Sequence, residues 1–401
     1  MSKFPLAVPF ALALALPGLA QTFVVDVNLG PGFDFQQIRG AIAQVPDGAT
    51  LLVRSGTYAA FAIDGKGLTI LAEPGATVTV TGAAGGISSV RNTAASQRTV
   101  IRGLRFDWQF TFDNCAGPIL VEDVTMVAGQ FHLDPATGLL FAFGCDQLFA
   151  RGVQNDATTS VFDSAAVFED CALNGLDAHT DPGSQHAGAP SLYVSGASVT
   201  LVDCALQGGA GLLLAPNQAL PPSPGITSSG GQLRLLGATV VAAGAPNGTA
   251  TVPALGRKYA VAAPIPVALD PQVQLVTAHP SVADPEFQLA VRPLPHVTGQ
   301  SAGTGATLTA SAPGPIGQFV ILVVGLPGAP ITLPGIDNAF WLDPTVSAWA
   351  AVGVPQTGAP LLGSATIPNH PSFRGLMVGW QSLTQGPNGL EASNPAWTLV
   401  R

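Results

Sequence analysis

One polar stretch of this sequence brings together side chains that could do chemistry. Residues 174–190 include Asp177, His179, Asp181 and His186, so two of the six histidines lie close together in the chain. Imidazole and carboxylate groups at this spacing could act as general acid and base or bind a divalent metal. We therefore treat His179, Asp181 and His186 as candidate catalytic residues, and Asp177, His179 and His186 as candidate metal ligands. The alternative, a solvated Gly- and Pro-containing loop with incidental polar residues, stays open.

The elements that must position these side chains follow an internal repeat. Six segments share the order apolar, apolar, charged or apolar, Gly or Asp, small apolar or Cys, any residue, apolar. They are residues 100–106, 120–126, 149–155, 167–173, 200–206 and 234–240. An irregular period of about 18–34 residues is typical of a stacked array of short strands.

Stacking the segments in register predicts columns of side chains that lie about 4.8 Å apart. One inward column is predicted to be apolar: Ile101, Val121, Ala150, Phe168, Leu201 and Leu235. The Gly or Asp column marks the bend of each rung, because Gly adopts unusual dihedral angles and Asp bonds its own backbone. Its members are Gly103, Asp123, Gly152, Asp170, Asp203 and Gly237. We interpret these Asp residues as bend residues rather than calcium ligands. The sequence shows no evident cofactor site, and calcium binding stays open as the one alternative.

The column between these two alternates in charge along four rungs, through Arg102, Glu122, Arg151 and Glu169. We predict that the four side chains form one line on the exterior of the stack. Each ion pair of such an exposed ladder would contribute roughly a few tenths of a kcal/mol.

A short helix is predicted to cover the open end of the stack. Asp34 can cap it and Gln37 can reach back to the cap, and four apolar residues then share one face: Ile38, Ala41, Ile42 and Val45. The helix would cover the first rung, whose edge is otherwise unpaired. The first clear strand follows at residues 51–53.

The same stretch has a recognisable pattern, continued at residues 63–70 as a further rung. Its residues are Phe35, Ile38, Ala41, Ile42, Pro46, Asp47, Gly48, Thr50, Val53, Gly56, Thr57 and Tyr58. This pattern resembles the opening of pectin-lyase-like right-handed parallel β-helix proteins over about residues 34–72, and the looser repeats to about residue 242 fit it. The resemblance implies the fold but no single activity, since the superfamily holds lyases, hydrolases, esterases and non-enzymes.

The catalytic patterns of that superfamily are incomplete in this chain. Lyases of this fold use an arginine as base, which is the alternative to the charge ladder; we favour the ladder because each Arg has a Glu neighbour in register. Residues 159–171 loosely resemble the strand that carries the catalytic aspartate of pectin methylesterases, but Thr159 stands at that position. The Asp motifs of polygalacturonases are absent, as are paired carboxylates for glycoside cleavage.

The four cysteines fall into two pairs, Cys115 with Cys145 and Cys171 with Cys204. Cys171 and Cys204 hold the same position on consecutive rungs, which places their Cα atoms within disulfide range. Two outcomes stay open: disulfide bonds, which secretion permits, or buried free thiols whose side chains are too parallel to bond.

The N-terminal stretch and the net charge predict where the protein is located and which partners it excludes. Lys3, an apolar run at residues 6–16 and small residues at 18–20 indicate a signal peptide over residues 1–20. No later segment has the length of a membrane span. We expect a bacterial protein that is secreted or held at the cell surface. The net charge of −9 argues against a nucleic-acid partner.

The C-terminal part has a different pattern. We expect the β-helix over residues 21–262, a cap or connector over residues 263–302, and a small antiparallel β-sandwich over residues 303–401, where apolar runs alternate with turn signals. The sandwich resembles C-terminal modules of large secreted bacterial proteins. Its four tryptophans either fill the core or form an exposed sugar-binding row: Trp341, Trp349, Trp380 and Trp397.

Two functions follow from this all-β architecture. The first, which we favour, is a non-catalytic β-helix protein that has a surface role or binds a polysaccharide or cell-surface glycan. The second is a polysaccharide lyase or glycoside hydrolase, with residues 174–190 beside its substrate. Whether the chain is an enzyme stays open.

Overall fold

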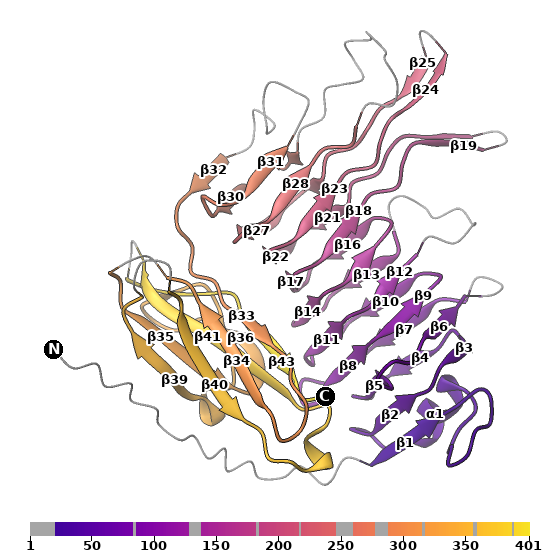
Figure 1. Cartoon of the computed structure of the whole chain (residues 1–401). Helices are drawn as coiled ribbons and strands as arrows, with labels where there is room; N and C mark the ends of the chain where they lie inside the picture. Colours follow the sequence, from indigo (N-terminus) through magenta and orange to yellow (C-terminus); the bar gives the residue numbers. More distant parts are fainter. Residues whose placement is uncertain are drawn as a thin grey trace. The chain divides into compact units, whose positions relative to one another are not determined.

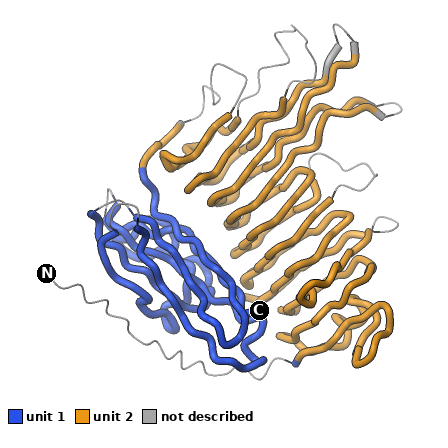
Figure 2. Tube along the Cα trace, in the orientation of Figure 1, with its two compact units in different colours: residues 1–21, 293–401 blue, residues 22–292 orange. Residues whose placement is uncertain are grey.

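The structure is a computed structural model that describes residues 21–82, 86–127, 138–181, 184–215, 218–245, 260–276, 288–314, 317–355, 359–386 and 389–401. The predicted signal peptide lies outside these residues. Two compact units divide the described residues, one over Thr22–Arg292 and the other over Pro293–Arg401 (Figure 2). No helix in the described ranges has the length and apolar character needed to cross a membrane.

Three parallel sheets build the larger unit (Figure 1). The first sheet runs in the order β1 (Thr22–Val25), β2 (Thr50–Val53), β5 (Thr69–Ala72), β8 (Thr99–Arg102), β11 (Ile119–Glu122), β14 (Leu148–Arg151), β17 (Ala165–Glu169), β22 (Ala197–Val202), β27 (Gly231–Leu236), β30 (Pro266–Leu269) and β32 (Gln288–Val291).

The second and third sheets follow the same chain order. The second contains β3 (Gly56–Ala59), β6 (Val78–Thr81), β9 (Leu104–Phe106), β12 (Thr125–Met126), β15 (Gln154–Asn155), β18 (Ala172–Asn174), β23 (Ala205–Gln207), β28 (Val240–Ala242) and β31 (Gln274–Val276). The third contains β4 (Ala62–Asp64), β7 (Ser88–Arg91), β10 (Phe110–Asp113), β13 (Leu140–Phe143), β16 (Thr159–Phe162), β21 (Leu192–Ser195), β26 (Ile226–Ser228) and β29 (Val261–Ala262).

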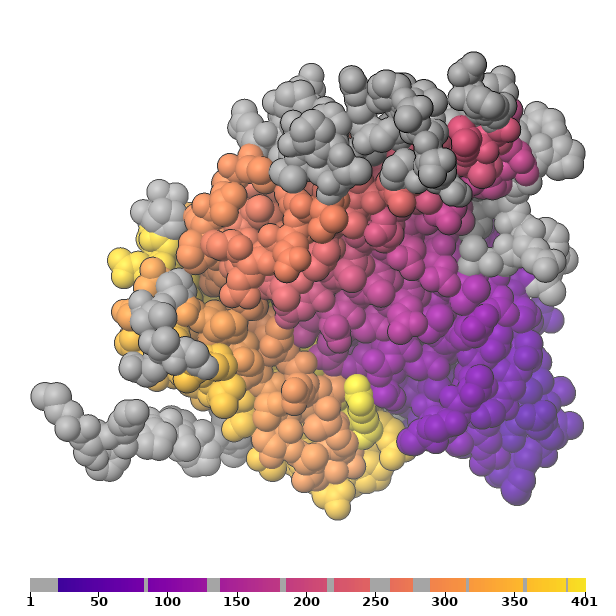
Figure 3. Space-filling view, turned by 45° about the horizontal axis from the view of Figure 1, so that its top comes forward, coloured from indigo at the N-terminus to yellow at the C-terminus, as the bar shows by residue number. Residues whose placement is uncertain are grey.

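Each rung visits the three sheets in turn, so the predicted parallel β-helix is confirmed. In the space-filling view, the colours of this unit change in successive bands from indigo to orange, as stacking in chain order requires (Figure 3). The strand register aligns Ile101 with Val121 and Ala150 with Phe168, and the column continues through Leu201 and Leu235. All six side chains are buried in one core.

The predicted bend column is also confirmed. All its members have positive φ, from Gly103 at 73° to Asp203 at 53°, a region that costs most L-residues free energy. Asp203 Oδ1 accepts a hydrogen bond of 2.7 Å from the backbone N–H of Ala238 on the next rung. A Cβ at Gly237 would lie 2.2 Å from that oxygen. Glycine is therefore required at 237 both by its φ of 59° and by the close approach of Asp203.

The capping helix α1 spans Ile38–Gln44 and buries Ile38, Ala41 and Ile42. Its predicted capping box is wrong: Gln37 is the N-cap and makes no side-chain cap. The Asp34 carboxylate instead accepts a hydrogen bond of 2.7 Å from the N–H of Val24. Asp34 is engaged in this way because an additional strand, β1, precedes β2 and pairs with it. The sequence pattern did not predict β1.

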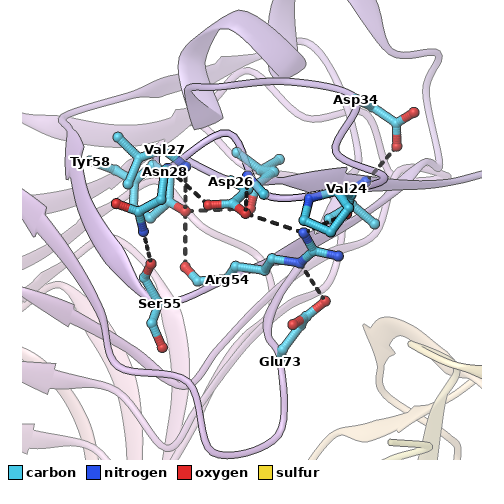
Figure 4. A network of polar contacts seen from close by, with 12 residues as sticks. Val24, Asp26, Val27, Asn28, Asp34, Arg54, Ser55, Tyr58 and Glu73 are labelled. Atoms are coloured by element: carbon cyan, nitrogen blue, oxygen red, sulfur yellow. Dashed lines mark hydrogen bonds and ion pairs between the residues drawn. The ribbon is translucent and has the colours of Figure 1, made fainter.

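An ion network holds the loop after β1 against the first rungs (Figure 4). The Asp26 carboxylate accepts hydrogen bonds from the N–H groups of Asn28 and Gly30, both at 2.9 Å, and from Arg54 Nη1 at 3.2 Å. Arg54 Nε lies 3.5 Å from Glu73 Oε1. The hydrogen bond from Asn28, together with those from Arg54 and Gly30, holds the pKa of Asp26 below its usual range.

The helix continues further than expected. Residues 263–302 were predicted to be a cap or connector, but β30 and β32 add strands to the first sheet in parallel register. The boundary between the units lies between Arg292 and Pro293. Pairing with the preceding rung assigns these strands to the β-helix, and the local Pro-rich sequence does not reveal that pairing.

The smaller unit contains antiparallel sheets, as predicted. One sheet has the order β33 (Thr298–Gln300), β34 (Thr307–Ala312) and β40 (Leu361–Thr366). A second has the order β37 (Ile336–Asp337), β42 (Gly389–Ala392), β41 (Met377–Gly386), β35 (Val320–Gly325) and β39 (Ala348–Gly353), with β43 (Ala396–Leu399) paired to β41. The pair β36 (Pro327–Ile331) and β38 (Phe340–Leu342) and the short 3₁₀ helices η2 (Pro344–Val346) and η3 (Pro371–Phe373) complete the unit.

The two larger sheets of this unit share one core, which includes Leu308 and Leu322 from facing strands. Trp341, Trp380 and Trp397 are buried, whereas Trp349 is 69% exposed. The tryptophans thus mainly fill the interior, and the exposed row considered above does not form.

Candidate functional site

The charge ladder lies on the outward side of the first sheet. Strand register places Arg102, Glu122, Arg151 and Glu169 side by side on β8, β11, β14 and β17. Arg102 Nε lies 3.0 Å from Glu122 Oε2, and Arg151 forms a second ion pair with the same carboxylate. The predicted line of side chains is therefore confirmed.

The predicted exposure of this ladder is wrong. Glu122 has a side-chain exposure of 0%, and Arg151 and Glu169 are also buried. Burial disfavours the charge of Arg151, but Glu122 and Glu169 outweigh it and raise the pKa of the guanidinium. An arginine held in its protonated form is a poor base, so this geometry supports a structural role for the ladder.

The polar stretch that contains the candidate catalytic residues forms an antiparallel hairpin. Strands β19 (His179–Asp181) and β20 (Ser184–His186) leave the stack after β18 and precede β21 (Figure 1). His179 lies directly opposite His186. Their rings stack with centroids 4.9 Å apart and an interplanar angle of 16°.

Asp177 does not complete a three-residue site. Its Oδ1 accepts a hydrogen bond of 2.7 Å from the N–H of Ala210 on the next rung, which ties the base of the hairpin to the stack. The backbone carbonyl of Asp177 lies 3.0 Å from His179 Nδ1. The side chain of Asp181 lies outside the described structure. The part of the chain that the structure describes holds no group of three or more His, Cys, Asp or Glu side chains placed for one metal ion.

Aromatic side chains on the outer face of the third sheet form a second candidate site. The rings of Phe141 on β13 and Phe162 on β16 have centroids 5.3 Å apart, and those of Phe162 and Tyr193 on β21 are 5.5 Å apart. We call these three residues the aromatic row. Each ring is partly exposed, and Phe143, beside them on β13, is 40% exposed.

The backbone explains why this row faces outward. Side chains alternate along a strand, and the buried Leu140 and Ala142 point into the core, so Phe141 and Phe143 point away from it. Parallel pairing of β13 with β16 and of β16 with β21 then brings rings from three successive rungs together. The row does not follow from the six-segment repeat, because the repeated segments begin with strands of the first sheet. Period-two alternation around Phe141 and Phe143 was the available signal.

Two hairpin arms leave the stack at one corner, between the second and third sheets. One is β19–β20; the other, β24 (Leu212–Ala215) with β25 (Gln218–Leu220), lies between β23 and β26. Both arms project on the same side of the larger unit (Figure 1). The hairpin with the histidine pair therefore joins the third sheet at the N-terminal end of β21.

The position aligned with an esterase aspartate is not a surface site. Thr159, the first residue of β16, is fully buried, and its hydroxyl accepts a hydrogen bond of 2.7 Å from Asn155 Nδ2. The residue therefore packs inside the stack.

Of the two outcomes left open for the cysteines, the structure has the second: all four are free and buried. Cys115 and Cys145 are neighbours, and their thiols share a hydrogen bond. This bond lowers the pKa of Cys115 to about 7 and raises the pKa of Cys145. Burial, and then contact with Cys171, raises the pKa of Cys204. Side chains from stacked parallel strands point in the same direction, which does not favour the geometry of an S–S bond.

Comparisons with known proteins add little beyond the fold. No protein-family model matches this chain, and no curated protein matches it. Among solved structures, the crystal structure of pectate lyase Pel9A matches with 12% sequence identity. That match covers 67% of this chain and 79% of that chain, with a TM-score of 0.33. A similarity at this level concerns the fold and says nothing about activity.

Proposed function

We propose that this chain is a secreted, non-catalytic β-helix protein that binds a neutral polysaccharide along the outer face of the third sheet. The aromatic row is the observation that carries this proposal. Sugar rings have apolar C–H faces that stack on aromatic side chains, and Tyr also offers a hydroxyl for hydrogen bonding. Rings on successive rungs repeat along the stack, which suits an extended polymer better than a compact ligand.

Charge favours a neutral partner. The outward positions of β10, β13, β16 and β21 are Thr111, Asp113, Phe141, Phe143, Ser160, Phe162, Tyr193 and Ser195, none of them cationic. The whole chain carries a net charge of −9. Arg91 on the adjacent strand β7 is an outward cation of the same sheet, and it is paired with Asp64. An acidic polysaccharide would therefore meet repulsion over β10, β13, β16 and β21 without an Arg or Lys on these strands to bind its carboxylates.

The remaining polar groups favour binding over catalysis. Arg102 and Arg151 of the ladder both pair with Glu122, and the cross-strand neighbour of His179 is another histidine, His186, rather than a carboxylate. Glycoside cleavage requires two carboxyl groups placed on either side of the scissile bond.

A binding panel tests the proposal. The full secreted chain is incubated with insoluble or gel-embedded polysaccharides, neutral and acidic, with and without calcium, and retained protein and released sugar are both measured. We expect retention by a neutral polymer without product release. Phe162→Ala should weaken retention at least about fivefold, on the order of 1 kcal/mol for a lost stacking contact.

Phe319→Ala is the matched control, because Phe319 is an exposed phenylalanine of the other unit. Its retention should equal that of the unmodified protein. Release of sugar that is abolished by His179→Ala would replace the binding function by an enzymatic one. Retention unaffected by Phe162→Ala would reject the aromatic row as the binding surface.

A further inference from the structure

The hairpin β19–β20 presents a pair of imidazoles in a fixed relation. His179 and His186 are cross-strand partners, and their rings are stacked. Both side chains are partly exposed, so an ion from solvent can reach them. We propose that this histidine pair binds one divalent late transition-metal ion, with Cu²⁺ held more tightly than Ni²⁺ or Zn²⁺.

The hydrogen bond at His179 determines which nitrogen would bind. Its Nδ1 lies 3.0 Å from the carbonyl oxygen of Asp177, and a carbonyl can only accept. Nδ1 must therefore carry the proton, which leaves the lone pair of the neutral ring on Nε2. Metal-ligating histidines commonly donate their second N–H to a backbone carbonyl in this way, which fixes the tautomer and the ring orientation.

The base of the hairpin is anchored. Asp177 Oδ1 accepts from the N–H of Ala210, the N–H of Ala178 donates to the carbonyl of Ala210 at 2.8 Å, and the N–H of Ala189 donates to Leu176 at 2.8 Å. The first two bonds tie the incoming leg of the hairpin to the next rung, and the third joins the two legs to each other. The two rings are thereby held close before an ion arrives, which lowers the entropy lost on binding.

The His179 ring is held by its bond to the carbonyl of Asp177, so the adjustment falls on His186. Rotation about its last side-chain torsion, which is broad for histidine, would direct a nitrogen of that ring toward an ion bound at His179 Nε2. Two imidazoles leave the remaining coordination positions to water, so we expect weaker binding than at a three-ligand zinc site.

The ligand chemistry selects the metal. Imidazole nitrogen suits Cu²⁺, Ni²⁺ and Zn²⁺, whereas Ca²⁺ and Mg²⁺ require oxygen ligands. The order of affinity then follows the general series for divalent ions, in which Cu²⁺ binds most tightly. The proposal is independent of the glycan-binding function, because it uses none of the residues of the aromatic row.

Titration of the untagged full chain with Cu²⁺, Ni²⁺, Zn²⁺ and Ca²⁺ tests the proposal, with calorimetry for affinity and electron paramagnetic resonance for the Cu²⁺ complex. We expect one Cu²⁺ site with two nitrogen ligands, weaker Ni²⁺ and Zn²⁺ binding, and no response to Ca²⁺. Lowering the pH should weaken binding, because protons compete for the ring lone pairs.

His179→Ala and His186→Ala should each weaken Cu²⁺ binding at least about tenfold, since each removes one of the two protein ligands. His370→Gln is the matched control: His370 is an exposed histidine of the other unit, and its replacement should leave the affinity unchanged. Unaltered unfolding transitions would show that the variants are folded. Absence of a stoichiometric site, or an affinity in either hairpin variant equal to that of the unmodified chain, would overturn the proposal.

Discussion

The outer faces of the first and third sheets belong to the same rungs, and each departs from the usual rule that charged side chains are exposed and aromatic ones buried. On the first sheet, charged residues are buried and paired, with Glu122 between Arg102 and Arg151. On the third sheet, Phe141, Phe162 and Tyr193 remain partly exposed. Buried charge and exposed aromatic surface are both informative departures from the average protein. The difference separates a face that holds the fold together from a face that is available to a ligand.

The largest expected effect is on the first sheet. Glu122→Gln removes the carboxylate shared by the buried Arg151 and the partly exposed Arg102, and breaking a buried ion pair in this way costs about 3–5 kcal/mol. Calorimetry should show a lower unfolding temperature for the β-helix unit. Polysaccharide retention, measured below that temperature, should not change.

Asp123→Asn is the control for this variant. Asp123 also pairs with Arg102, at 3.1 Å, but its side chain is 47% exposed, and Asn tolerates the positive φ of this position. Loss of an exposed pair should cost less than about 1 kcal/mol. Equal destabilisation by the two variants would contradict a role for burial.

The next largest effect is on the third sheet, where a substitution should weaken polysaccharide binding and leave stability nearly unchanged. Tyr193→Ala removes one end of the aromatic row and should weaken binding to a neutral polysaccharide by roughly 1 kcal/mol. The unfolding temperature should change little, because the ring is partly exposed. A large stability loss with unchanged retention would show that the row is structural and would erase the contrast between the two faces.

The smallest effect concerns the partly exposed network of the first rungs. The pKa of Asp26 lies below its usual range, mainly because of the hydrogen bond from Asn28. Such a group adds stability above its ordinary pKa, and this stability is lost as the pH falls through the lowered value. The protection of the β1 amides against hydrogen exchange, relative to their intrinsic exchange rate at each pH, should therefore fall on acidification below about pH 4.

Asp26→Asn should remove that pH dependence, because the side chain no longer titrates. Exchange in β11, whose Glu122 belongs to the buried ladder, serves as the internal comparison. Identical acid sensitivity of β1 in the variant and the unmodified chain would rule out Asp26 as the responsible group.

Sequence patterns predicted the inside of the stack better than its outside. The column from Ile101 to Leu235 and the bends at Gly103 and Asp203 were recognisable because inward packing and positive φ each restrict the residue types locally. The alignment of Arg102 with Glu122 followed from the same register. Their burial did not, since the environment of an outward side chain depends on residues distant in sequence.

The candidate sites show the same limit. The sequence drew attention to His179 and His186 through their proximity, but their direct pairing depends on an antiparallel hairpin that the pattern did not indicate. Phe141, Phe162 and Tyr193 are separated by insertions of different length, so no fixed period connects them. Only the pairing of β13, β16 and β21 brings them together.

Oxidative footprinting of aromatic side chains tests the central claim most directly. The full chain is oxidised with and without the neutral polysaccharide that it retains best, and modified residues are measured by mass spectrometry. The account predicts protection of Phe141, Phe162 and Tyr193, with Phe319 and Trp349 of the other unit unchanged. Unaltered oxidation of the three rings in the bound state would contradict it.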